Sequence, residues 1–174
     1  MTEILETLTE DSSPPATLLE SLRKRRLETL DETTKRLEIP GYNGDLFAEY
    51  RMLDPKELER LGKKVVREFK KSRADLVLYG ATDSLITACV AIHVRDEQGE
   101  LVPLHEVLGE DNPIVFDVRL ANTLGFEPGP TARAIVFDAF CRRDMAIIQQ
   151  NVALSNWMSG IENSPLDGDD LGEA

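Results

Sequence analysis

Residues 75–95 read DLVLYGATDSLITACVAIHVR and decide the fold. Between its ends the stretch carries one formal charge, on Asp83, and a second on His93 when that ring is protonated. The many apolar side chains leave no polar face wide enough for water, and a segment that is apolar all round is buried. Polar residues interrupt it too often for a membrane span. The stretch therefore predicts a central core helix that runs into a short strand near Ala91.

Length and composition are typical of one globular domain, with 174 residues and 41% hydrophobic side chains. We expect this domain over residues 39–162, after a helix over residues 14–38. The acidic termini, residues 1–13 and 163–174, are expected to be disordered. Together they carry eight carboxylates and no Lys or Arg, so the net charge of −12 falls to −4 without them.

This charge disfavours nucleic acid as a partner, because acidic segments repel phosphate. A basic run, Arg23–Arg26, interrupts the acidic pattern within the predicted first helix. It has two interpretations, a nucleic-acid or localisation signal and a solvated helix face paired with neighbouring carboxylates. We favour the second. The acidic start at Met1 has no apolar segment of a signal peptide, so a cytoplasmic protein without membrane contact is expected.

The next segments predict a strand and a helix. A turn cluster at residues 39–44 is expected to end the first helix. Residues 45–52 alternate as a strand does, and the following helix has an N-terminal capping box at Asp54 and Glu57 with Pro55 in its first turn. The apolar side of the strand is expected to hold Leu46, Ala48, Tyr50 and Met52.

A β-hairpin is predicted after the central helix, with strands near 91–95 and 100–104 turned at Gly99. Pro103 places the second strand at an edge. We expect residues 105–113 to be a loop, and residues 114–116 to be a short strand or an anchor. The fold class is then α+β, mainly α.

Two polar residues predict the starts of later helices. Asp117 caps a short helix that ends at Gly125, and Thr131 caps the next one. A last helical stretch is expected to end at Gly160. Its apolar residues Met145, Ile148, Trp157 and Met158 are interpreted either as helix core or as an adaptable partner-binding surface.

No catalytic motif is found, so we expect a non-enzymatic protein without cofactor or metal. Cys89 and Cys141 are interpreted as small buried hydrophobic residues. With His93 and His105 they are also a conceivable zinc set, but the spacing follows no ordinary zinc pattern. A nucleophile at Ser84 or Cys89 would have only His93 nearby in the sequence.

Four segments resemble the tail assembly chaperones of long-tailed (siphovirus-type) actinobacterial phages. They read IPGYNGDLFAEYRMLDPKEL, ATDSLITACVAIHVRDEQGELVPL, FDVRLANTLGF and ARAIVFDAFCRRDMAIIQQNVALSNWMSG. The resemblance covers residues 39–161 and does not extend to the basic helix before them. It implies a non-catalytic protein that binds the tape-measure protein while the tail-tube protein polymerises around it.

The resemblance also implies a place in the host cell cytoplasm and absence from the mature virion. A longer form made by ribosomal frameshifting is a further implied partner, and Leu171–Glu173 is compatible with a slippery codon run. Two alternatives stay open, an acidic host-protein inhibitor or DNA mimic, and a structural head–tail or tail completion protein.

Overall fold

The computed structural model describes residues 16–31, 33–70 and 72–161 of the chain. The chain divides into two compact units between Thr33 and Thr34. The described residues contain seven helices and four strands, an α+β fold that is mainly α, as predicted. None of the described helices is long and apolar enough to cross a bilayer. The termini predicted to be disordered, 1–13 and 163–174, lie outside the described residues.

The first unit contains helix α1, Ala16–Asp31. All its described side chains, from residue 17 to residue 29, are exposed. The predicted helix over residues 14–38 is too long, because Thr34–Glu38 form strand β1. This strand pairs with a second strand, and the paired residues lie between nine and seventeen positions apart in the chain. Such pairing is a tertiary contact, which overrides a weak helical pattern.

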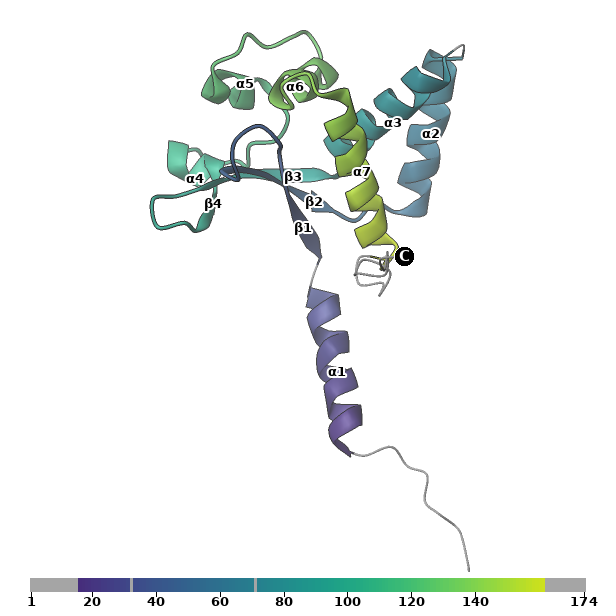
Figure 1. The fold of residues 1–174 in the computed structure, drawn as a ribbon, viewed down its shortest axis with the longest axis vertical. Coiled ribbons are helices and arrows are strands. Elements are labelled where there is room, and N and C mark those ends of the chain that lie inside the picture. The colour runs from purple at the N-terminus through teal and green to yellow at the C-terminus, as the bar shows by residue number, and fades with distance from the viewer. Residues whose placement is uncertain (1–15, 32, 71, 162–174) are drawn as a thin grey trace, which may run out of the picture. The chain divides into compact units, whose positions relative to one another are not determined.

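The second unit is built on a four-stranded antiparallel sheet in the order β1-β2-β3-β4 (Figure 1). Strands β2 (Leu46–Arg51), β3 (Cys89–Arg95) and β4 (Leu101–Pro103) match the predicted strands. The turn cluster at residues 39–44 joins β1 to β2 and does not end a helix. The Ile39 amide donates to the Leu46 carbonyl at 2.9 Å and closes this hairpin.

One face of β2 is fully in the core. Leu46, Ala48 and Tyr50 are buried, as strand alternation predicts. Met52 was expected on the same side but is 47% exposed. The reason is that β2 ends at Arg51, so the period of two no longer applies to Met52.

The central stretch folds as predicted, with helix α3 (Arg73–Ala88) leading into β3 at Cys89 without a loop. Helix α3 contacts helices on three sides, α2 (Pro55–Glu68), α6 (Ala132–Ala139) and α7 (Asp144–Met158). Leu85 and Ala88 are buried, but Val77 is 48% exposed. The helix is therefore the centre of the second unit without being buried all round.

The capping box at the start of α2 is confirmed. The Asp54 carboxylate accepts from the Lys56 and Glu57 amides at 2.8 and 2.9 Å, and Glu57 accepts from the Asp54 amide at 3.0 Å. Pro55 occupies the first turn. These contacts are local in sequence, so the residue types alone determine them.

The region after the second hairpin is more regular than predicted. Helix α4, Leu104–Leu108, occupies the first four residues of the expected loop and ends at Gly109 with a φ of 70°. A helix of five residues is too short to leave a periodic pattern. Ile114 is an anchor, since it is buried and its carbonyl accepts from the Ile92 amide at 2.7 Å.

The later helices begin where the sequence predicts. Asp117 caps α5, Val118–Leu124, and Gly125 ends it. Thr131 caps α6 by accepting from the Ala134 amide at 3.2 Å. Between α6 and α7 the chain turns at Cys141 and Arg142, both with positive φ, so the two helices are separate.

Two glycines are expected to respond oppositely to alanine substitution. A Cβ at Gly62, inside α2, would meet no atom within 4 Å, so Gly62→Ala is expected to stabilise by about 0.5–1 kcal/mol. A Cβ at Gly129 would lie 2.4 Å from the Ala134 Cβ, so Gly129→Ala is expected to cost roughly 1–3 kcal/mol. Urea denaturation of both variants measures this. Equal effects would contradict the packing described at these positions.

Candidate partner-binding surface

Helix α7 has apolar side chains on two opposite faces. The inward face packs into the core through Ile147, Leu154 and Trp157, all buried. On the other side, Met145 is 63% exposed and Val152 51% exposed, with Ile148 half-buried between them. Spacings of three and four residues align these three on one side of a helix. We call Met145, Ile148 and Val152 the outward stripe.

The four residues predicted as a partner-binding surface therefore do not form one surface. Met145 and Ile148 lie on the outward stripe, whereas Trp157 is 7% exposed and belongs to the core. Met158 is half-buried, and its sulfur accepts from the Leu53 amide at 3.4 Å. The sequence pattern misleads because Trp157 follows Val152 by five residues, which turns the side chain about 140° around the helix.

Val152 completes the stripe, and an absence of charge could have revealed it. Residues 145–161 contain no Asp, Glu, Lys or Arg in a chain that is 30% charged. A helix face that only meets water normally carries charges. The centres of protein interfaces, by contrast, are depleted of charged residues.

A hollow of about 390 Å³ lies at the N-terminal end of α7. Tyr79 and Phe137 form part of its apolar wall, with their rings edge to face at 5.9 Å. Asp138 and Arg142 form an ion pair at 2.9 Å among its polar lining residues. The complete lining is Leu78, Tyr79, Ala134, Phe137, Asp138, Arg142 and Asp144. No sequence spacing predicts this hollow, because its residues come from α3, α6 and the start of α7.

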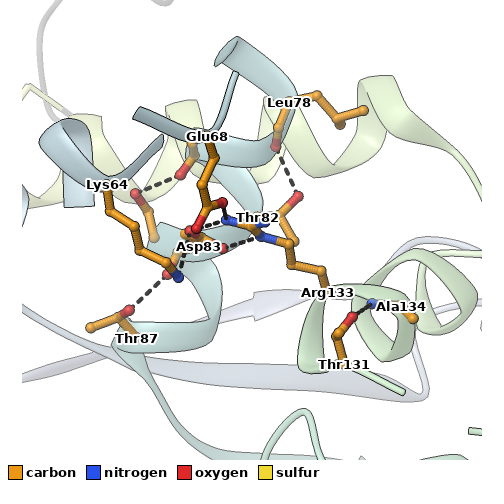
Figure 2. Close-up of polar contacts among 11 residues, drawn as sticks. Lys64, Glu68, Leu78, Thr82, Asp83, Thr87, Thr131, Arg133 and Ala134 are labelled. Atoms are coloured by element: carbon orange, nitrogen blue, oxygen red, sulfur yellow. Dashed lines mark hydrogen bonds and ion pairs between the residues drawn. The ribbon is translucent and has the colours of Figure 1, made fainter. Parts of the chain in front are cut away.

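Four charged side chains join α2, α3 and α6 (Figure 2). The Asp83 carboxylate accepts two bonds from the Arg133 guanidinium, each of 2.6 Å. Arg133 also donates to Glu68 at 2.8 Å, and the Lys64 ammonium lies 3.3 Å from Asp83. We call Lys64, Glu68, Asp83 and Arg133 the polar cluster. Its two cations and two anions cancel, so the cluster is suited to holding helices together.

The environment of the polar cluster favours the ionised forms of Asp83 and Arg133. Burial favours the neutral form of Asp83, but the bonds and charges of Arg133 and Lys64 outweigh it and lower the pKa of the carboxyl. Bonding to Asp83 raises the pKa of Arg133.

The polar cluster also fixes the aromatic wall of the hollow. The Arg133 guanidinium lies 5.4 Å from the Phe69 ring centre and 5.3 Å from that of Tyr79. These two rings stack on each other at 4.2 Å. Cation–π contact adds to the ion pairs, so Tyr79 is held in position from two sides. The cluster therefore helps to fix the shape of the hollow at Tyr79.

A second polar pair lies within the sheet. His93 on β3 is 2% exposed, and its Nε2 contacts the Glu49 carboxylate on β2. Thr34 donates to the same carboxylate at 2.5 Å. The His93 Nδ1 is buried and has no hydrogen-bond partner among the described residues. This arrangement fits a neutral ring with its proton on Nε2, since a protonated ring would bury an unpaired donor.

Stability is expected to fall as the pH drops from 7 to 5.5 because of His93. Burial lowers the pKa of His93 below its ordinary 6.5, despite the opposing bond to Glu49; Arg36 and His105 also disfavour the charge. The stabilisation linked to the neutral His93 ring is complete above pH 6.5. Below this pH the free energy of unfolding falls by at most about 1.4 kcal/mol per pH unit. Urea denaturation across this range measures the slope. A His93→Gln variant with the same slope would contradict the assignment.

The conceivable zinc set is not assembled. Among the described residues, no three His, Cys, Asp or Glu side chains are grouped to hold a metal ion. Cys89 is buried, as predicted, whereas Cys141 is exposed, so the prediction for Cys141 is wrong. It sits in the turn between α6 and α7, where a positive φ points the chain away from the helical path.

No protein-family model, curated protein or solved structure matches the chain.

Proposed function

We propose that the protein is a phage tail assembly chaperone that binds the tape-measure protein and assists assembly of the tail tube without catalysis. The outward stripe is the observation that carries this proposal. Its residues, at positions 145, 148 and 152, follow the anchor spacing by which one helix lies against another. The resemblance of residues 39–161 to such chaperones supports it from the sequence.

The proposed binding mode uses the outward stripe and the hollow at the N-terminal end of α7. An apolar stripe on a helical tape-measure protein would pack against Met145, Ile148 and Val152, and one large apolar side chain would enter the hollow beside Tyr79. Such stripes aggregate when they are left exposed. Covering them keeps the partner dispersed until the tail-tube protein takes its place.

The small size of these surfaces suits a temporary complex. Only Met145 and Val152 of the stripe are more than half exposed. Interfaces with little buried area are typical of transient encounters. We propose that the complex forms in the host cytoplasm, that the chaperone is absent from the mature virion, and that the tail-tube protein and a frameshifted longer form of this chain are further partners.

Co-expression with the tape-measure gene tests the proposal. The wild-type chain is expected to keep the tape-measure protein soluble and to co-purify with it. A Met145→Ser/Val152→Ser variant is expected to lose both effects. Val107→Ser is the matched control, because Val107 is 58% exposed on α4 and belongs to neither surface.

Two outcomes would contradict the proposal. One is equal co-purification by the stripe variant and the control variant. The other is no association of the wild-type chain at all.

Mass spectrometry of purified particles separates a chaperone, which is expected to be missing, from a structural tail completion protein. Competition with DNA for a basic protein tests the remaining alternative, a DNA mimic.

A further inference from the structure

Helix α2 presents a basic surface in an otherwise acidic chain. Residues 56–73 carry eight Lys or Arg and three Glu, against a net charge of −12 for the whole chain. The helix packs on α3 through its buried side, which includes Val65. On the opposite side a shallow hollow is lined by Glu59, Arg60, Gly62, Lys63, Val66 and Arg67. We call the side bearing these six residues the basic face.

The basic face has both unpaired charge and apolar surface. Lys63 is paired with Glu59 at 2.5 Å. Within the described ranges, however, no carboxylate lies within ion-pair distance of Arg60 or Arg67, and Glu57 acts on Arg60 only at longer range. Val66 is 55% exposed, and Gly62 leaves a gap next to it because it has no side chain. The surface therefore fits an acidic segment that also carries an apolar residue.

We propose that the acidic C-terminal segment, residues 162–174, binds the basic face of α2 in the same molecule. The segment reads ENSPLDGDDLGEA, with five carboxylates and no Lys or Arg. Its Leu171 lies between acidic residues. Carboxylates at Arg60 and Arg67 would place this leucine against Val66, in the gap left by Gly62.

The last described residues lie close to the start of α2, so the segment that follows can reach this surface. The Met158 sulfur at the end of α7 accepts from the Leu53 amide, and Leu53 directly precedes the cap of α2. Ten residues from Ile161 to Leu171 span up to about 33 Å when extended. Gly62 and Val66 lie only about 15–20 Å along the helix from Leu53. The segment is therefore long enough with residues to spare.

Attachment to the same chain favours this occupant over a free acidic ligand. Exposed ion pairs are individually weak, so a separate peptide would bind poorly. A short connection raises the effective concentration to the millimolar range, which compensates for weak contacts. The inference does not depend on the proposed function.

Nuclear magnetic resonance of the full-length chain tests the inference. The test variant replaces all five acids, as Glu162→Gln, Asp167→Asn, Asp169→Asn, Asp170→Asn and Glu173→Gln. At low salt its amide signals for Gly62, Lys63, Val66 and Arg67 are expected to differ from those of the wild type. The differences are expected to vanish at about 0.5 M salt, because screening weakens exposed ion pairs.

An arginine pair supplies the matched control. When Arg60→Gln/Arg67→Gln is present in both proteins, the five-acid changes are expected to leave these amide signals unaltered. With Arg23→Gln/Arg25→Gln on α1 in both proteins, the differences are expected to remain. The inference is overturned if the five-acid variant leaves the basic face unchanged, or if the α1 pair removes the effect instead. Differences that grow with protein concentration would also overturn it, since they would indicate binding to a second copy.

Discussion

Replacing Asp83 with asparagine is expected to lower the free energy of unfolding by about 3–5 kcal/mol. Asp83 is 4% exposed and supplies both acceptor oxygens to Arg133, whose side chain is itself only 21% exposed. An amide removes the negative charge and turns one acceptor into a donor, so Arg133 and Lys64 lose their buried counter-charge. Urea denaturation at pH 7 measures the loss.

Two controls make the Asp83 result specific. Asp83→Leu/Arg133→Met removes both charges at once and is expected to cost much less than the sum of the single changes. Glu59→Gln breaks the exposed pair with Lys63 and is expected to cost at most about 1 kcal/mol. If Asp83→Asn cost no more than Glu59→Gln, the polar cluster would not hold the helices together.

The Asp83 contribution also has a defined pH dependence. The pKa of Asp83 in the folded chain is lowered, with Arg133 as the main favourable cause against burial. Its stabilisation is therefore complete above the unfolded pKa of about 3.9 and is lost as the pH falls below that value. This loss of stability in acid is distinct from the loss of stability near neutral pH that is assigned to His93.

Replacing Trp157 with alanine is expected to destabilise the protein by about 3–5 kcal/mol. The indole is 7% exposed and lies in the same hydrophobic core as Tyr50 and Leu154, so its removal leaves a cavity. Thermal or urea denaturation measures the effect. Met145→Ala, on the outward stripe of the same helix, is expected to change stability by less than about 0.5 kcal/mol.

The pair of variants separates folding from binding on α7. If Trp157→Ala and Met145→Ala cost the same, the assignment of inward and outward faces would be wrong. If Met145→Ala keeps its stability but weakens association with the tape-measure protein, the outward stripe is a contact surface. Partner binding measured with Trp157→Ala alone would not distinguish an interface from a damaged core.

Local features of the fold could be predicted from the sequence. The cap at Asp54 and the turn at Gly99 depend on neighbouring residues, so the residue types determine them. The core helix that runs into β3 is also local, because residues 75–95 are mostly apolar. The strand at Thr34–Glu38 could not be predicted, since its pairing with β2 competes with a helical pattern only in the folded chain.

The candidate site was predictable only in part. Met145 and Ile148 were identified from their spacing, but spacing alone does not tell which side of a doubly apolar helix meets the core. The polar cluster depends on Asp83 meeting Arg133, fifty residues away. A single sequence gives no indication of such a distant pair.

The two sulfhydryl groups differ in a way that has a practical consequence. Burial raises the pKa of the Cys89 thiol to about 12, whereas Cys141 is exposed and immediately precedes Arg142, which lines the hollow at the N-terminal end of α7. Because thiolates are the reactive form, a maleimide dye added to the native chain should attach at Cys141 and spare Cys89. Its fluorescence would then test, without an engineered residue, whether the proposed partner binds at the hollow.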